Sequence, residues 1–119
     1  MIRGTVNARH EAVVPLRVRA PSDVDAVIDT GFTGILTLPP ALISALNAPV
    51  ASQVDVQLGD GTMRQYDTFD LEVEWDGVWL AVRVTEIDTN PLLGTRLLAG
   101  HEVYAEFVPG GVVDITAIP

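Results

Sequence analysis

The chain has 119 residues, of which 48% are hydrophobic and 19% are charged, and its formal net charge is −9. These values predict one folded domain over residues 1–119 and exclude a disordered chain. Its seven basic residues are all arginine and do not cluster, which argues against nucleic acid and anionic membranes as partners.

The residue types that are missing narrow the chemistry further. The chain has no cysteine, which excludes disulfides and thiolate catalysis. Its first residues lack the apolar core of a signal peptide, and no apolar run approaches the roughly 20 residues that a membrane helix needs. We therefore expect a cytoplasmic protein.

The first part of the sequence predicts three strands and a helix. In residues 14–18, valine and leucine alternate with arginine and proline, as in a half-exposed strand. Pro21-Ser22-Asp23 then interrupts the chain, and residues 24–28 are typical of a more buried strand. A short strand is expected within residues 35–38. Two prolines follow it and begin a helix that ends near Asn47.

The middle of the sequence predicts two hairpins. Residues 54–58 alternate between apolar and polar side chains, and Gly59-Asp60-Gly61 then makes a tight turn. Residues 69–75 place apolar side chains on one face and acidic side chains on the other, so much of the negative charge belongs to a solvated strand face. Asp76-Gly77 is a strong type I′ turn signal, and residues 78–84 form the return strand.

The last part of the sequence predicts a short helix and a final hairpin. Thr95 is expected to cap a helix of little more than one turn, and Gly100 is expected to close it. Residues 103–108 and 112–118 are expected to pair across Pro109-Gly110-Gly111. The whole pattern is mainly β with one or two short helices.

Asp29-Thr30-Gly31 is the most informative motif, because it places a carboxylate directly after the apolar run of residues 26–28. A carboxylate can activate water as a general base, and a second carboxyl can then supply the acid. Two carboxyls at short range share one proton, since both cannot ionise comfortably. The chain has a single Asp-Thr-Gly, so this pair requires a homodimer in which Asp29 faces the partner's Asp29.

Two segments resemble motifs of the retropepsin-like (clan AA) aspartic proteases. They are Val-Ile-Asp-Thr-Gly-Phe-Thr-Gly at residues 27–34, and Leu92-Leu93-Gly94 before a short helix. Within that family the sequence is most similar to small prokaryotic proteins with an Asp-Thr-Gly-Phe motif. The resemblance implies a single retropepsin-like closed β-barrel, the acid protease fold. It also implies an aspartic endopeptidase that acts on peptides or proteins as a homodimer, without a metal or another cofactor.

The resemblance also implies roles for the residues of the first motif. Asp29 is expected to be catalytic, and Thr30 to hydrogen-bond across the dimer beneath the catalytic pair. Gly31 is expected to let the loop approach both substrate and partner. Phe32 stands where viral relatives usually have a small residue, so its ring is expected beside the cleft as part of the substrate pocket.

Two further segments acquire roles in the same way. Leu92, Leu93 and Gly94 are expected to form the fold signature that packs against the active-site loop. By position, Gly59-Asp60-Gly61 resembles the tip of the flap that closes over a bound peptide. Glycine suits such a lid, because the lid must bend and bring its backbone to the substrate.

Three alternatives remain open from the sequence. Asp29 is also a residue that an ordinary turn favours, since a turn aspartate bonds to nearby backbone amides. A silent peptide-binding or dimerisation module on the same fold is favoured by the bulky Phe32 and by the cytoplasm, where an unrestrained protease is hazardous. The third is an unrelated small β-barrel in which the tripeptide is incidental.

Other kinds of site have little support in the sequence. His10 and His101 are the only histidines and lie far apart in a chain without cysteine, which argues against zinc. Residues 59–61 lack the spaced oxygen ligands of a calcium loop, and residues 31–34 fit neither a dinucleotide nor a phosphate motif.

Overall fold

The computed structural model describes residues 1–19 and 22–119, and most of its regular structure is β. Within those residues the strands are β1 (Ile2–Val6), β2 (Ala12–Val18), β3 (Ser22–Ile28), β4 (Leu36–Leu38), β5 (Val50–Gln57), β6 (Met63–Trp75), β7 (Val78–Glu86), β8 (Leu92–Leu93), β9 (His101–Ala105) and β10 (Val112–Ala117). The helices are α1 (Pro40–Leu46) and α2 (Thr95–Leu98).

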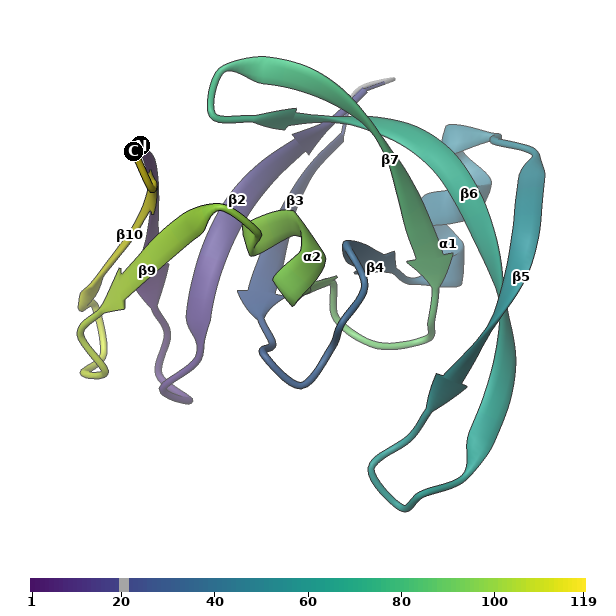
Figure 1. Ribbon diagram of the computed structural model, residues 1–119, viewed down its shortest axis with the longest axis horizontal. Coiled ribbons are helices and arrows are strands. Elements are labelled where there is room, and N and C mark those ends of the chain that lie inside the picture. The colour runs from purple at the N-terminus through teal and green to yellow at the C-terminus, as the bar shows by residue number, and fades with distance from the viewer. Residues whose placement is uncertain (20–21) are drawn as a thin grey trace.

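The sheet closes on itself to form a barrel (Figure 1). Six strands make the ring in the order β2-β3-β8-β4-β7-β6, and β6 pairs with β2 to complete it. Most neighbours are antiparallel, but β3 pairs with β8 and β4 with β7 in parallel. The predicted closed barrel of the acid protease fold is therefore confirmed.

The remaining strands extend this barrel at two ends. β1 pairs with β2 and with β10, and β9 is the outermost strand beside β10. At the other end β5 pairs with β6 and forms a long hairpin that projects from the body of the molecule (Figure 1).

The barrel interior is filled by the apolar side chains that the alternating patterns predict. These residues form one buried cluster, and apolar burial of this kind is the main favourable term in folding. Apolar side chains with no measurable exposure come from β2, β3, β4, β6, β7, β8 and β10: Val14, Val18, Ala26, Leu36, Leu38, Val73, Val84, Leu93 and Val113.

The acidic strand is confirmed as a half-solvated element of the barrel. In β6, Phe69, Val73 and Trp75 are buried, whereas Asp70 and Glu72 face solvent. Arginines on neighbouring segments lie against this acidic face in three ion pairs: Asp70–Arg83, Glu72–Arg19 and Glu74–Arg17. Because all three pairs are exposed to solvent, each contributes little to stability.

The predicted type I′ turn between β6 and β7 is also present. Asp76 has φ 51° and Gly77 has φ 82°, and Trp75 pairs with Val78 across the turn. Two consecutive positive φ values are what a two-residue type I′ hairpin requires. The helix that was predicted to end near Asn47 is α1, and Asn47 closes it in the left-handed conformation.

Three local predictions differ from the structure. Ser22 and Asp23 belong to β3 and pair with β2, so they do not interrupt the chain, while Pro21 lies outside the described residues. The strand predicted over residues 103–108 ends at Ala105 in β9. Thr95 does not cap α2: the cap is Gly94, and Thr95 is already inside the first turn.

Neither helix of the described residues has the length and hydropathy needed to cross a bilayer.

Substitutions at Gly77 and Gly59 test how much the left-handed conformation of the β6–β7 turn contributes to stability, because neither glycine is crowded. No atom lies within 4 Å of a Cβ built on Gly77 or on Gly59, but only Gly77 has a positive φ. We expect Gly77→Ala to lower the free energy of unfolding by about 1 kcal/mol. Gly59→Ala is expected to leave it unchanged or slightly higher, because alanine restricts the unfolded chain. Urea denaturation measures both, and equal losses contradict the assignment.

Candidate active site

Asp29 lies at the carboxyl end of β3, where the parallel pairing with β8 continues for one more residue. Val27 and Ile28 pair with Leu92 and Leu93. The amide of Asp29 then donates to the carbonyl oxygen of Leu93 at 3.0 Å. The backbone of Asp29 is therefore held by a buried strand, as expected for a carboxylate that must be placed accurately.

The carboxylate is oriented by its own turn. The amide of Gly31 donates to Asp29 Oδ1 at 2.9 Å, and the amide of Phe32 donates to the carbonyl oxygen of Asp29 at 3.1 Å. Oδ2 accepts no hydrogen bond from residues 1–19 or 22–119. The bond to Gly31 is also the one that an ordinary turn aspartate makes, so by itself it supports both readings of Asp29.

The loop that follows Asp29 crosses the β8–α2 junction and is fixed to it through the backbone. We call residues 29–35 the Asp29 loop. The amides of Gly94, Thr95 and Arg96 donate to carbonyl oxygens of this loop at 2.9, 2.9 and 3.1 Å. The accepting residues are Ile35, Phe32 and Gly34, respectively. Of the segment Leu92-Leu93-Gly94, Gly94 donates to this loop and Leu93 accepts from the amide of Asp29.

This crossing needs glycine at two positions. A Cβ on Gly94 would lie 2.1 Å from the carbonyl oxygen of Gly34 and 2.7 Å from Cδ2 of Phe32. A Cβ on Gly34 would lie 2.5 Å from Cζ of Phe32. A side chain on Gly94 would therefore push the backbone of the Asp29 loop away from α2, whereas a side chain on Gly34 would displace the ring of Phe32.

The same distances place the ring of Phe32. The ring lies over Gly34 and Gly94 and is half-buried. It therefore packs within its own chain, on the loop that carries Asp29. Thr30 and Gly31 are exposed beside it. A part for Phe32 in a substrate pocket, and for Thr30 across a dimer, stays a prediction.

Thr37 is a positioning residue that the sequence reading missed. It is fully buried in β4, and its Oγ1 accepts a hydrogen bond from the amide of Leu92 at 2.9 Å. This bond satisfies the first amide of β8, the strand on which Asp29 depends. The sequence could have indicated this role, because Thr37 is the one polar residue between two leucines in a short strand that is buried on both faces.

The predicted flap residues form the turn between β5 and β6. The amide of Leu58 donates to Thr62 at 2.8 Å and that of Gly61 donates to Leu58 at 2.9 Å, which closes the turn. Gly59, Asp60 and Gly61 are all exposed, and Gly61 has φ 86°. The turn lies along the same edge of the molecule as the Asp29 loop (Figure 1). Within the described residues, no hydrogen bond joins it to that loop.

Asp60 organises the tip of this hairpin. Its Oδ1 accepts hydrogen bonds from the hydroxyl and the amide of Thr62 at 2.6 and 3.0 Å. These two bonds favour the ionised form and lower the pKa of Asp60 below its ordinary value of 3.8, the hydroxyl bond having the larger effect.

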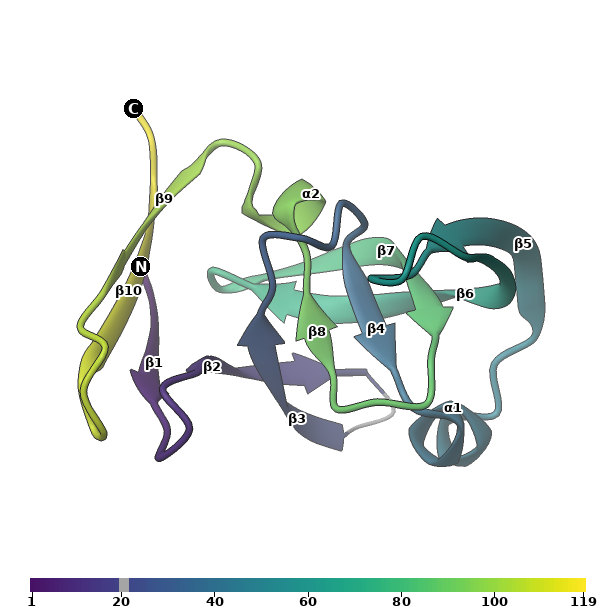
Figure 2. The ribbon, with the colours of Figure 1, turned by 90° about the horizontal axis from the view of Figure 1, so that it is seen from below.

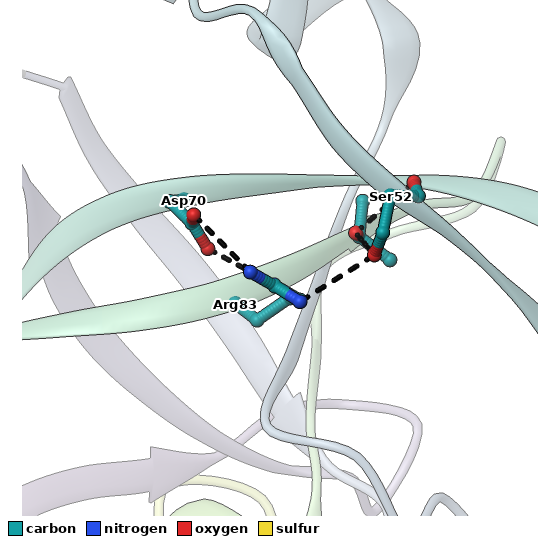
Figure 3. Close-up of polar contacts among 4 residues, drawn as sticks. Ser52, Asp70 and Arg83 are labelled. Carbon is teal, nitrogen blue, oxygen red and sulfur yellow. Dashed lines mark hydrogen bonds and ion pairs between the residues drawn. The ribbon is translucent and has the colours of Figure 1, made fainter.

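The base of the same hairpin is held by a small polar network (Figure 3). The hydroxyl of the buried Thr68 donates to the carbonyl oxygen of Ser52 at 3.1 Å, so the hydroxyl of Ser52 donates to Thr68 Oγ1 at 2.7 Å. Arg83 on β7 donates to Ser52 Oγ at 3.5 Å and makes two bonds to Asp70. These bonds to the guanidinium lower the pKa of Asp70. The network sits where the β5–β6 register shifts, and it ties the hairpin to the barrel.

The depressions in the surface lie away from Asp29. One of about 410 Å³ is bordered by Arg17, Asp23 and Glu74, and one of about 420 Å³ by Gly4 and Pro15. Neither includes Asp29 in its lining. Thr30 and Gly31 of the Asp29 loop are exposed in the single chain.

Comparison with known sequences gives no assignment. No protein-family model matches the chain, and no curated protein matches it.

Comparison with solved structures identifies the fold. The chain is similar to a retropepsin-like aspartic protease from Rickettsia conorii, with a TM-score of 0.60 and 14% identity, over 99% of this chain and 92% of the other. An EIAV protease bound to the inhibitor HBY-793 has a TM-score of 0.58 and 17% identity, over 79% and 90%. The simian foamy virus (mac) protease has a TM-score of 0.56 and 17% identity, over 72% and 90%.

These similarities show that the chain has the retropepsin-like fold. The resemblance drawn from the Asp-Thr-Gly-Phe and Leu-Leu-Gly motifs is confirmed at the level of fold. The alternative of an unrelated small β-barrel is wrong, because the barrel is retropepsin-like.

The hydroxyl of Thr37 gives a test of the support beneath Asp29. Thr37→Val keeps the shape but leaves the buried amide of Leu92 without its acceptor, which costs about 1–3 kcal/mol. Thr37→Ser keeps the acceptor and removes only a methyl group, which costs about 0.8 kcal/mol. We therefore expect valine to lower the free energy of unfolding more than serine in urea titrations. The opposite order contradicts the role given to this bond.

The tip of the β5–β6 hairpin makes a prediction about pH. Because the folded-state pKa of Asp60 is lowered, its bonds to Thr62 add stability above pH 3.8 and are lost only as the pH falls through that lower value. We expect the carboxyl carbon of Asp60 to titrate below 3.8 in an NMR experiment. Thr62→Val removes the stronger donor and is expected to move the midpoint upward. Identical midpoints contradict the arrangement.

Proposed function

We propose that the protein is an aspartic endopeptidase that hydrolyses peptide bonds as a homodimer. The observation that carries this proposal is the placement of Asp29. It stands at the end of β3, its amide is bonded to Leu93, and its loop is fixed by backbone bonds to the β8–α2 junction of a retropepsin-like barrel. This support is more than a turn aspartate needs.

In the proposed mechanism, Asp29 and the partner's Asp29 share one proton. The ionised carboxyl takes a proton from a water molecule, whose oxygen attacks the peptide carbonyl carbon. The protonated carboxyl donates its proton to the carbonyl oxygen, giving a neutral tetrahedral intermediate. The carboxyl that took the water proton then gives it to the peptide nitrogen. The C–N bond breaks as the other carboxyl takes a proton from a hydroxyl of the intermediate, so the pair again holds one proton. Asp29 Oδ2 fits this role, because Oδ1 already accepts the Gly31 amide.

The mechanism requires a homodimer because it uses two catalytic carboxyls and each chain supplies one. The exposure of the Asp29 loop supports this requirement. One chain contributes one Asp-Thr-Gly. Thr30 and Gly31 are exposed beside Asp29, so a second copy can lie against them and supply the other wall of the cleft. A twofold axis beside Asp29 gives each carboxyl an identical partner.

The substrate is proposed to lie extended beneath the β5–β6 hairpin. An extended peptide offers its backbone for strand-like hydrogen bonds and its alternate side chains to pockets. The tip suits a moving lid, because a Cβ on Gly59 or Gly61 would meet no atom within 4 Å. The polar network around Ser52 and Arg83 keeps the base of the lid fixed. The proposal includes a cytoplasmic location, and it needs neither metal nor cofactor.

A second candidate function is a silent peptide-binding or dimerisation module. The position of Phe32 favours it, because this residue belongs to the Asp29 loop and its ring fills the space over Gly34 and Gly94. In this second candidate the barrel keeps the Asp29 loop, but the ring leaves no space beside Asp29 for the peptide bond that would be cleaved. Exposure to a diverse peptide library separates the two candidates: inhibitor-sensitive cleavage supports the enzyme, and binding without cleavage at any pH supports the module.

Replacement of Asp29 is the direct test of the enzyme. Asp29→Asn is expected to abolish peptide cleavage, because an amide cannot take the proton from water, and to leave the folded dimer intact. Asp25→Asn is the matched control, since Asp25 is an exposed carboxylate on the same strand. The wild type is expected to be blocked by a transition-state-mimicking aspartic protease inhibitor and to be most active at acid to neutral pH. Persistent turnover by pure Asp29→Asn protein would falsify the assignment.

A further inference from the structure

The large apolar side chains that remain exposed are concentrated at the carboxyl-terminal hairpin. Among the described residues, ten large hydrophobic side chains are exposed, and six of them belong to β9, β10 or the segments beside them. They are Val103, Tyr104, Phe107, Val108, Val112 and Ile118. Phe107 is 60% exposed and Val108 58% exposed, which is unusual for such residues in a protein with a full apolar core.

The turn of this hairpin carries no charge. Residues 107–113 read Phe-Val-Pro-Gly-Gly-Val-Val, an uncharged run in a chain whose formal net charge is −9. Two copies of so acidic a protein repel each other over most of their surfaces. An uncharged apolar turn is a place where two copies can touch without bringing carboxylates together.

The turn is rigid, so its exposed side chains are presented in fixed positions. We call residues 107–112 the hairpin tip. The amide of Gly110 donates to the carbonyl oxygen of Val6 at 2.8 Å, and the amide of Val6 donates to Gly111 at 2.9 Å. A Cβ on Gly111 would lie 2.0 Å from the carbonyl oxygen of Glu106, so the tip is closely packed beneath its surface. A pre-organised apolar patch loses little entropy on binding.

The hairpin tip lies on the edge of the molecule that carries the Asp29 loop. In Figure 1 the β9–β10 turn, the Asp29 loop and the β5–β6 turn follow one another along the lower edge, and Figure 2 views the molecule from that edge. A twofold axis that passes beside both the β9–β10 turn and the Asp29 loop would bring each of these two turns against its own copy. Association about any other edge separates the two Asp29 side chains.

We propose that the hairpin tip, through Phe107, Val108 and Val112, is the self-association surface of this protein and that its occupant is the tip of a second copy. The proposal rests on the homodimer of the proposed function and adds where the two chains meet. Stable interfaces bury on the order of 1,600 Å² in total. The tip supplies the apolar anchor of that area, and the Asp29 loop and the β5–β6 turn supply the remainder.

A pair of matched valines gives the test. Val108 and Val78 are both 58% exposed, but Val78 follows the β6–β7 turn, away from the lower edge. Val108→Glu is expected to weaken the dimer at least tenfold in sedimentation equilibrium, because it places two like charges in an apolar contact. Val78→Glu is expected to leave the dimer unchanged. Circular dichroism melting is expected to show both variants folded like the wild type.

A mixture provides the second measurement. Val108→Arg alone is expected to weaken the dimer in the same way, and an equimolar mixture with Val108→Glu is expected to restore association, because opposite charges then meet across the axis. Equal dimerisation of the wild type and Val108→Glu overturns the proposal, and so does a mixture that stays monomeric or a wild type that is monomeric at every concentration.

These outcomes are independent of catalysis, because association is measured without substrate. A wild type that dimerises through the tip but cleaves no peptide supports this inference and contradicts the proposed enzyme. A wild type that cleaves peptides while Val108→Glu dimerises and cleaves equally well supports the enzyme and overturns this inference.

Discussion

The backbone crossing between the Asp29 loop and the β8–α2 junction is the constraint on which the candidate site depends. Four main-chain hydrogen bonds hold it. Because both partners of each bond are backbone atoms, these bonds do not depend on the length of any side chain. The crossing is close because Gly34 and Gly94 lack side chains, and the ring of Phe32 covers both. A carboxylate mounted on such a junction keeps its position, which reactions that depend on positioning require.

One part of the molecule is held by hydrogen bonds between elements and another only by bonds within its own turn, and this division agrees with the proposed chemistry. Asp29 is fixed through β3 and β8, and the base of the β5–β6 hairpin is fixed through Thr68 and Arg83. The tip of that hairpin is exposed and is organised only by bonds within the turn, chiefly those from Thr62 to Asp60. A lid needs this combination, because its hinge must stay in register while its tip opens and closes.

Much of the fold could be predicted from local sequence patterns, because the spacing of apolar residues along one strand or helix indicates which of its faces is buried. The alternation in residues 69–75, the Asp76-Gly77 turn and the helix before Asn47 all appear as expected. The parallel β3–β8 pairing could not be derived from any local pattern, since it joins segments far apart in the chain. The resemblance to a known family implied only that Leu92-Leu93-Gly94 packs against the active-site loop. Thr95 shows the limit at fine scale, because a threonine at the first helical position looks like one at the cap.

The details of the site that escaped prediction have a common physical origin: they depend on contacts at close range between distant segments. Thr37 bonds to Leu92, and Phe32 lies on Gly94, across more than fifty positions of sequence in each case. In a symmetric dimer, such contacts also form between two copies of the chain. If two acidic copies meet about one axis, every residue at that axis meets itself, so a charge there is repelled by its own copy. Contact at such an axis is therefore easiest where a segment carries no charge, and the uncharged hairpin tip meets that condition.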